Sequence, residues 1–217
     1  MGVVKLDYYV LVLRGKDSIS LVNGLSTNKV DGTCTTVFTT QTAKIIDMVD
    51  VVVSEGFVAL IGHNLYKDNL VQHINRKILA QDVTISDVSS ANQVYLATSE
   101  IAVPGNVTIC ETFRGWIIVA PINTELEVTM TEMEFENYRV ENMIPIQGKE
   151  ITPSNHPLAC GLGHLVHEAK GCYIGQEILA RMRSRGKQGK QLVRVSNPVD
   201  DATSIGISHS LAIRLVK

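Results

Sequence analysis

The sequence has no long hydrophobic run, although 45% of its 217 residues are hydrophobic. No apolar stretch reaches the roughly 18 to 20 residues that cross a bilayer, which excludes an ordinary membrane-spanning helix. The first apolar stretch is short, contains Asp7, and is followed by Arg14 and Lys16 rather than by a small-residue cleavage site. We therefore expect a soluble globular protein without a membrane partner, whose chain starts with a strand rather than a signal peptide.

Cysteine is scarce as well. The four cysteines, Cys34, Cys110, Cys160 and Cys172, are too few and too scattered for the disulfide framework of a small secreted protein. This favours a reducing, cytoplasmic setting in which all four act as thiols.

Charged residues make up only 19% of the chain, and the formal net charge is -2. One segment departs from this balance, because residues 170–194 hold seven basic residues and a single acid, Glu177. The seven are Lys170, Arg181, Arg183, Arg185, Lys187, Lys190 and Arg194. A local excess of positive charge favours an anionic ligand or partner.

Short β-type runs and a few amphipathic stretches mix without a regular strand–helix alternation, and turn signals are frequent. The pattern predicts an α+β fold of antiparallel sheets flanked by helices, with no low-complexity linker. Strands are expected at 8–13, 33–40, 44–53, 57–62, 82–87, 93–98, 106–110, 115–120, 191–196 and 210–216, and helices at 18–25, 64–79, 132–138 and 176–185. Asn64 and Asn123 are the expected helix caps at their positions. Residues 1–187 form the predicted main domain, and residues 188–217 form a β segment too short to be a domain.

Cys172 is the first candidate for chemistry. It is flanked by glycine, precedes a predicted helix and has cations nearby, and these influences favour the thiolate. It would then act as a nucleophile, a redox group or a metal ligand. The alternative is a small buried hydrophobe beside a turn.

Two further hypotheses concern the same region. Cys160, His164, His167 and Cys172 offer the ligand types that zinc prefers, although their spacing matches no common zinc module. The basic run offers a surface for phosphates, polyanionic tails or RNA, or simply a solvated face. Tyr173 is the only aromatic residue near that run, which disfavours nucleic acid as a partner.

Three acids are candidate ligand-binding groups. Asp47 and Asp50 lie in a predicted strand at a spacing that places them on opposite faces, so they are not expected to act as a pair. Glu141 follows an acid-rich helix and precedes Pro145. If it lies inside a pocket, its carboxylate can accept two hydrogen bonds from a donor-rich heterocycle.

The segment KGCYIGQE, residues 170–177, resembles the KGCYxGQE motif of the YgfZ-like folate-binding proteins, which are homologous to the aminomethyltransferase (T-protein) of the glycine cleavage system. The segments LVNGLSTNKV, TTQTAKIIDMVDVVV and YRVENMIPIQGKEI are similar to other stretches of that family. The resemblance covers residues 1 to about 195, and the remaining tail is similar to a shortened C-terminal β domain.

This resemblance implies tetrahydrofolate, or a one-carbon derivative of it, as the cofactor of residues 1–187. It implies that Cys172 is the working thiol and that Glu141, Asp47, Tyr173 and Arg181 bind the cofactor. It also implies iron-sulfur proteins or their assembly factors as partners, and a role in the assembly or repair of iron-sulfur enzymes. The basic segment would then attract the glutamate tail of the folate.

Some positions depart from the aminomethyltransferase pattern. Met48 stands where those enzymes have a second aspartate after Asp47, and Thr42 and Ala43 replace the glycines of the preceding turn. Asn142 and Met143 replace a small pair after Glu141. These departures argue against folate-dependent aminomethyl transfer, which is kept as an alternative to the leading hypothesis. A non-catalytic metal- or RNA-binding module is the other alternative.

Overall fold

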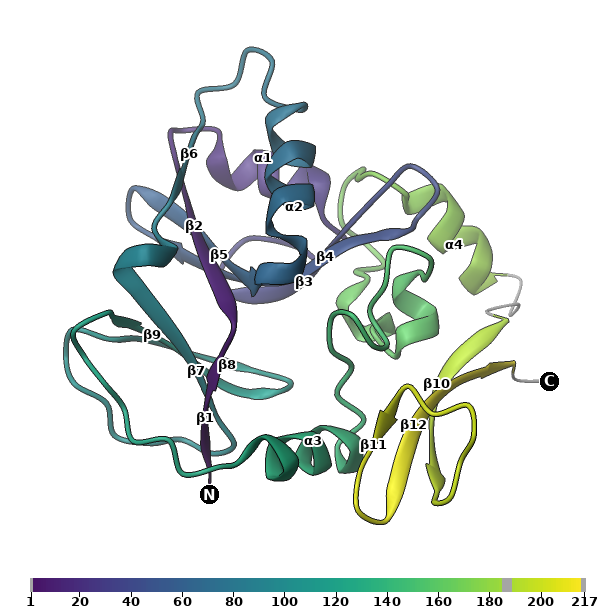
Figure 1. Cartoon of the computed structure of the whole chain (residues 1–217). Coiled ribbons are helices and arrows are strands. Elements are labelled where there is room, and N and C mark those ends of the chain that lie inside the picture. Colours follow the sequence, from purple (N-terminus) through teal and green to yellow (C-terminus); the bar gives the residue numbers. More distant parts are fainter. Residues whose placement is uncertain (1, 185–188, 216–217) are drawn as a thin grey trace.

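The computed structural model describes residues 2–184 and 189–215, which fold into three antiparallel sheets flanked by helices (Figure 1). The predicted α+β class with antiparallel sheets is thereby confirmed. In the described residues no helix is both long and apolar enough to span a membrane.

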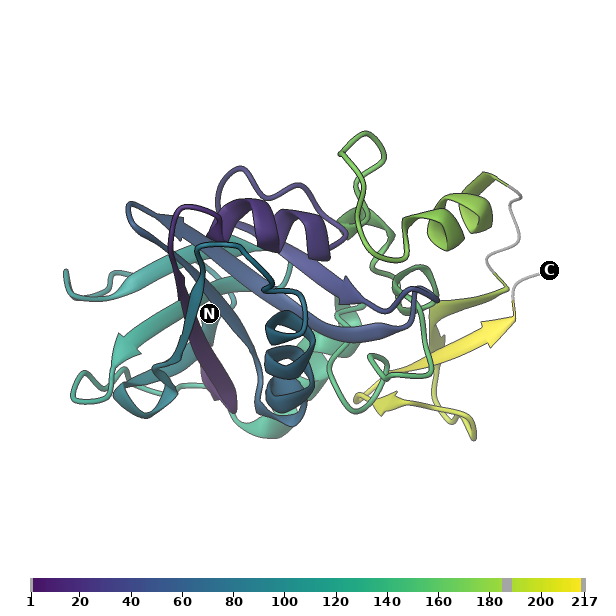
Figure 2. The same cartoon turned by 90° about the horizontal axis from the view of Figure 1, so that it is seen from above.

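The largest sheet has five strands in the order β3 (Cys34–Thr39), β4 (Ile45–Ser54), β5 (Phe57–His63), β2 (Tyr8–Arg14) and β6 (Thr84–Asp87). Both faces of this sheet are buried, because successive side chains of each strand point to opposite faces and most of them are apolar. One face packs beneath helices α1 (Ser18–Leu25) and α2 (Lys67–Asn75), which Figure 2 shows from above. The other face packs against the second sheet.

The second sheet has four strands in the order β1 (Val3–Leu6), β7 (Asn92–Ala97), β9 (Gly115–Pro121) and β8 (Thr108–Thr112). The chain passes between the two sheets twice. It goes from β1 to β2 across Asp7 alone, and from β6 to β7 through the short helix η2 (Ser89–Ala91). These two passages hold the sheets face to face around a shared apolar core.

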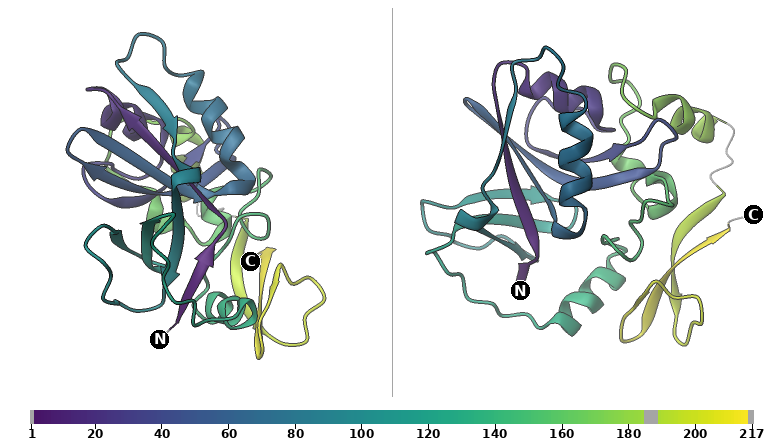
Figure 3. Two further views of the ribbon diagram at one scale, coloured as in Figure 1. Left: turned by 60° about the vertical axis from the view of Figure 1, so that its left-hand side comes forward. Right: turned by 45° about the horizontal axis from the view of Figure 1, so that its top comes forward.

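Helix α3 (Glu132–Glu141) leads from the second sheet to the rest of the chain, as both panels of Figure 3 show. The short helices η3 (Pro157–Cys160) and η4 (Gly163–Leu165) and helix α4 (Gln176–Ser184) follow. The C-terminal sheet has the order β10 (Lys190–Ser196), β12 (His209–Leu215) and β11 (Ser204–Ile205). It lies within the predicted segment 188–217, but the predicted boundary at residue 187 falls outside the described residues.

Two helix predictions need correction. The helix expected at 64–79 is split into η1 (Asn64–Tyr66) and α2, which ends at Asn75. Beyond it, the side-chain oxygen of Gln81 accepts hydrogen bonds from the backbone N–H groups of Leu79 and Ala80, which replaces further helical bonding. The cap expected at Asn123 begins no helix, because the chain there forms a turn and then runs extended to α3. His63, not Asn64, caps η1 through its ring nitrogen.

Candidate functional site

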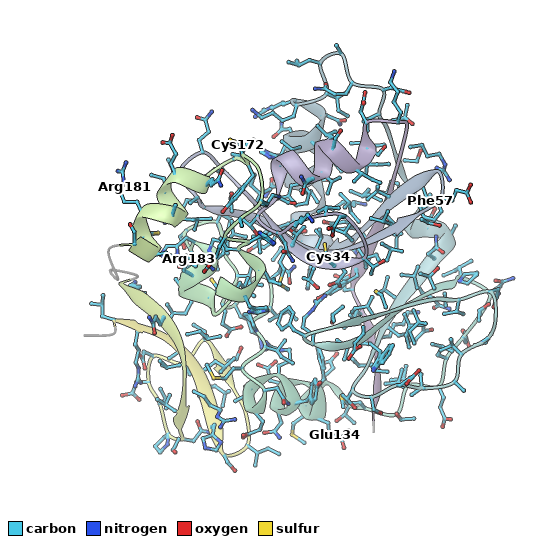
Figure 4. The ribbon with its side chains drawn as sticks, turned by 180° about the vertical axis from the view of Figure 1, so that it is seen from behind. Cys34, Phe57, Glu134, Cys172, Arg181 and Arg183 are labelled. Carbon is cyan, nitrogen blue, oxygen red and sulfur yellow. The ribbon has the colours of Figure 1, made fainter. Side chains whose placement is uncertain are left out.

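Cys172 lies in an exposed loop, residues 167–175, that leads into α4 and is called the thiol loop below (Figure 4). Its thiol is free and its side chain is exposed. The neighbouring residues of the loop are held firmly, and each makes a different contact with the body of the protein. Those contacts decide how the thiol is presented.

Lys170 anchors one side of the thiol loop. Its ammonium donates hydrogen bonds to the backbone carbonyls of Asn23, Ser26 and Asn28, at 2.6, 2.7 and 2.6 Å. These carbonyls lie at the C-terminal end of α1, where a positive charge is favourable. Burial lowers the pKa of Lys170 to about 8, against a smaller opposing effect of Cys34. Lys170 is thus a structural anchor and not part of an exposed basic surface.

Tyr173 and Gly175 anchor the other side. The Tyr173 ring is 8% exposed and packs among apolar side chains, and the Lys170 ammonium lies 5.1 Å from its centre. Gly175 has a φ of +87°, and a Cβ atom there would lie 2.7 Å from the carbonyl oxygen of Thr40. Only glycine fits such a close approach of two backbones. The Ile174 carbonyl between them accepts a 2.7 Å hydrogen bond from the Thr39 hydroxyl.

A pocket of about 260 Å³ lies beside the thiol loop, between the loop and α4. Arg183 lines it and donates to Glu168 at 3.2 Å and to the Gly163 carbonyl at 2.5 Å. Arg181, the arginine predicted to bind the cofactor, is exposed and points away from the molecule (Figure 4). The residues lining the pocket are Val166, His167, Glu168, Tyr173, Gln176, Ala180, Arg183 and Ser184.

Helical spacing could have identified Arg183 from the sequence. Gln176, Ala180 and Arg183 all line the pocket, and positions separated by four and then three residues share one face of a helix. Tyr173, which was predicted, lines the same pocket as Arg183.

The four possible zinc ligands are used in other ways. Cys160 is buried and its thiol donates to the Glu150 carbonyl, while His164 packs edge-on against Phe113 with ring centres 4.8 Å apart. His167 accepts a hydrogen bond from the backbone N–H of Ala169. Within residues 2–184 and 189–215, no three His, Cys, Asp or Glu side chains are placed to hold a metal ion.

The basic run does not form one surface. Lys170 points inward, Arg183 lines the pocket, and Arg194 contacts Glu141 at the far end of the C-terminal sheet. Arg185 and Lys187 lie outside the described residues. The positive charge that the sequence concentrates is therefore distributed over separate sites in the fold.

A second group of functional candidates is the buried polar cluster, defined as Tyr8, Tyr9, Asp47, Asp50, Arg114 and Gln147. None of these residues is more than 9% exposed. Asp47 accepts hydrogen bonds from the Tyr9 hydroxyl at 2.6 Å, from the Gln147 amide at 2.9 Å and from the Met48 backbone at 2.8 Å. Gly62 provides the space for this, because a Cβ atom there would lie 2.3 Å from the Tyr9 hydroxyl.

The environment of Asp47 favours its neutral form. Burial raises the pKa of the Asp47 carboxyl to about 7, although the hydrogen bonds from Tyr9, Gln147 and Met48 oppose the rise. Burial and the nearby Asp47 charge raise the pKa of Tyr9 well above its usual value. A carboxyl that titrates near neutrality can both accept and release a proton under physiological conditions.

Asp50 occupies the opposite side of β4, as its spacing from Asp47 predicted. Its carboxylate accepts a 2.7 Å hydrogen bond from Thr35 and forms a buried ion pair with Arg114. Arg114 also donates to the Tyr8 hydroxyl at 2.8 Å. Burial alone would lower the pKa of Arg114, but Asp50 and Tyr8 raise it above its usual value. The negative charge of Asp50 is thus compensated by the Arg114 guanidinium, whereas Asp47, within the described residues, receives hydrogen bonds only from uncharged donors.

Glu141 does not contact the buried polar cluster. It ends α3, and its carboxylate lies 2.8 Å from the His209 ring nitrogen and 3.3 Å from the Arg194 guanidinium. Both partners belong to the C-terminal sheet. Met143 is 40% exposed and does not fill the interior beside Glu141. The structure therefore separates the predicted residues into three places: Asp47 in the cluster, Tyr173 and Cys172 at the thiol loop, and Glu141 against the C-terminal sheet.

Sequence reasoning identified Asp47 and Asp50 as candidates but missed the other four members of the cluster, of which Arg114 and Gln147 make the decisive contacts. Arg114 follows Phe113 in the tight turn between β8 and β9, where a charged residue usually faces solvent. Gln147 comes from an irregular loop, and nothing local marks it as a partner of Asp47, 100 residues away. No sequence signal identifies either one, because both contacts depend on how distant segments meet.

No protein-family model matches this chain, and no curated protein matches it in sequence. Among solved structures, it is similar to the crystal structure of glycine cleavage system aminomethyltransferase T from Bartonella henselae. The TM-score is 0.78 and the sequence identity is 11%, over 99% of this chain and 78% of that chain. The protein therefore has an aminomethyltransferase-like fold, as the resemblance implied. Membership of the YgfZ-like family stays a prediction.

Proposed function

We propose that this protein binds a tetrahydrofolate species and supports the assembly or repair of iron-sulfur enzymes through the thiol of Cys172. The observation that carries the proposal is the construction of the thiol loop. Lys170, Ile174 and Gly175 fix its backbone, and Cys172 is left exposed between them. A loop that is anchored on both sides presents its thiol in a defined position, which suits reaction with a group carried by another molecule.

The aminomethyltransferase-like fold supports the folate half of the proposal. A pterin ring carries an amino group and ring N–H groups, and it needs hydrogen-bond acceptors. The Asp47 carboxylate is one acceptor, and the Gln147 side-chain oxygen is a buried acceptor that has no hydrogen-bond partner among the described residues. The chemistry of these acceptors therefore suits the donor groups of a pterin, which supports the proposal. Because the cluster is closed, folate binding must move the loop that carries Gln147. If Glu141 also binds the folate, its carboxylate must first release His209 and Arg194.

Calorimetry with tetrahydrofolate tests the folate half. We expect measurable binding to the wild type and at least tenfold weaker binding to Gln147→Leu, which removes the unpaired acceptor. Gln41→Leu changes an exposed glutamine and should bind as the wild type does. Absence of both heat and a thermal shift at millimolar ligand would rule out folate binding.

Complementation tests the thiol half. In a strain that lacks its own YgfZ-like protein, wild-type protein should restore the activity of iron-sulfur enzymes. Cys172→Ser should fold normally, because the side chain is exposed, but should not complement. Cys34→Ser, which changes a half-buried thiol, is the matched control and should complement. A fully active Cys172→Ser variant removes this residue from the mechanism.

A second candidate function is folate-dependent aminomethyl transfer. The shared fold and the raised pKa of Asp47 favour it, since a carboxyl that titrates near pH 7 suits proton transfer. Met48, in place of a second aspartate, argues against it. Formation of methylenetetrahydrofolate from an aminomethyl donor, lost in Asp47→Asn, would establish this activity. If no methylenetetrahydrofolate forms above the uncatalysed rate, aminomethyl transfer is ruled out and the thiol function stays the proposal.

A further inference from the structure

Three large apolar side chains are exposed where α3 meets the C-terminal sheet. Met133 is 69% exposed, Ile205 66% and Ile207 69%. We call these three residues the apolar patch. Single exposed hydrophobic residues are common on protein surfaces, but several that adjoin one another mark an interaction site.

Local packing brings together the two segments that carry the patch. The backbone N–H of Ile207 donates to the Asn137 side chain at 2.9 Å, and Gly206 lies against Asn137 and Val140 of α3. Ile205 and Ile207 flank Gly206, and Met133 lies one helical turn before Asn137 on the same face of α3. Val140 continues inward into a small core with Leu192 and Leu211. The segments that carry the patch therefore meet beside the small core that joins α3 to the C-terminal sheet.

Acidic residues surround the α3 side of the patch. From residue 115 to residue 138 the sequence has no lysine or arginine. Glu127, Glu132 and Glu134 are exposed, and among the described parts of the chain none of them forms an ion pair. Glu136 differs, because it is already paired with Arg139 and Lys149. The Glu134 carboxylate accepts hydrogen bonds from the backbone N–H and the hydroxyl of Thr131 but has no cation beside it in the part of the chain that the structure describes. Acidic charge without a paired cation thus lies on both sides of Met133 in the sequence.

We propose that the apolar patch and its acidic border bind a basic amphipathic segment of a partner protein. The apolar face of such a segment would cover Met133, Ile205 and Ile207, and its lysines or arginines would face Glu127, Glu132 and Glu134. A second copy of this chain is a poor occupant, because a symmetric contact brings the same glutamates together. An anionic membrane is repelled for the same reason. Glu134 and Cys172 lie at opposite ends of the molecule in Figure 4, so a partner bound here leaves the thiol loop open.

A synthetic amphipathic peptide of leucine and lysine serves as the probe, with fluorescence anisotropy as the readout. We expect it to bind the wild-type protein, and to bind more weakly as salt rises from about 50 to about 300 mM, because screening weakens exposed charge pairs. A peptide with the same leucines and with glutamate in place of lysine should not bind.

Two pairs of variants locate the site. Met133→Ser with Ile207→Ser should weaken peptide binding at least tenfold, and Glu127→Gln with Glu132→Gln should do the same. Leu79→Ser removes an apolar side chain that is 87% exposed elsewhere, and Glu55→Gln with Glu100→Gln removes two exposed charges elsewhere. These controls should bind the peptide as the wild type does.

Equal loss of peptide binding in the control variants, or no loss in the patch variants, would overturn the proposal. A dimer that dissociates in the Met133→Ser, Ile207→Ser variant would also overturn it.

Discussion

At the scale of single residues, the protein isolates polar groups in apolar surroundings and gives each a defined set of partners. Asp47 has three hydrogen-bond donors and Lys170 has three acceptors. Burial shifts the pKa of each toward its neutral form, to about 7 for Asp47 and about 8 for Lys170. The pKa values of both residues therefore depend on the fold around them.

Asp47→Asn should change how stability depends on pH. Because the pKa of Asp47 rises from 3.8 to about 7 on folding, the folded state holds a proton that the unfolded state has lost between these values. The stability that Asp47 contributes is thus largest below about pH 4 and decreases by up to about 4 kcal/mol as pH rises through 7. Urea unfolding of both proteins at several pH values measures this difference. A difference that stays constant from pH 4 to pH 8 would contradict the prediction.

Lys170→Met should loosen the thiol loop. The substitution leaves three carbonyls at the end of α1 without their donor, which should cost about 2 to 4 kcal/mol in the free energy of unfolding. Urea unfolding checks this cost, and hydrogen exchange of residues 171–175 checks the loosening. Lys190→Met, which changes an exposed lysine, is the matched control and should leave both unchanged. Unaltered exchange in Lys170→Met would mean that Lys170 does not anchor the loop.

At the scale of elements, α3 is the joint between the body of the protein and the C-terminal sheet. Arg139, 1% exposed, lies 3.5 Å from the fully buried Glu150 and donates to the Ser204 hydroxyl at 3.0 Å. Glu150 accepts hydrogen bonds from Thr203 and Ser204 as well. This network connects the helix, the loop after it and β11 through buried polar contacts.

Glu150→Ala should destabilise the protein by about 2 to 4 kcal/mol, because it removes one of the two carboxylates beside the buried Arg139 and leaves only Glu136. It also takes away the acceptor of the Thr203 and Ser204 hydroxyls. The double variant Arg139→Met, Glu150→Leu removes both charges and should recover part of that loss. Thermal or urea unfolding of the three proteins makes the comparison. A double variant less stable than Glu150→Ala would show that the network stabilises the joint by more than charge compensation.

At the scale of the whole molecule, the two larger sheets share chain passages and a common core, whereas the C-terminal sheet is attached mainly through α3 and η3. Acidic charge is also concentrated on and before α3, because residues 115–138 contain no lysine or arginine. The molecule thus has one large cooperative body and one smaller appended sheet.

Hydrogen exchange should show this division. We expect the amides of β5, the central strand of the five-stranded sheet, to be the most protected, and those of β10 and β12 to exchange earlier by local opening. Exchange measured by mass spectrometry on peptides from the intact protein makes the comparison. Equal protection in β5 and β12 would show that all three sheets open together.

The sequence by itself determined most of the elements and the fold class. Nearly continuous apolar runs predicted β2, β4, β5 and β9 closely, because a strand buried on both faces needs apolar side chains at nearly every position. The opposite orientation of Asp47 and Asp50 also followed from strand geometry alone. The end of α2 did not, because the chain after it is held in a turn by a hydrogen bond from the Leu79 backbone N–H to the Gln81 side-chain oxygen.

Only the tertiary structure decided which polar residues meet. It paired Asp47 with Gln147 and Asp50 with Arg114, and it directed Lys170 inward, although its sequence neighbours suggested a basic surface. It also placed Arg183 rather than Arg181 at the pocket and joined Glu141 to the C-terminal sheet. The physical reason is that periodicity records which face of an element is buried, whereas a polar contact depends on two segments that are close only after folding.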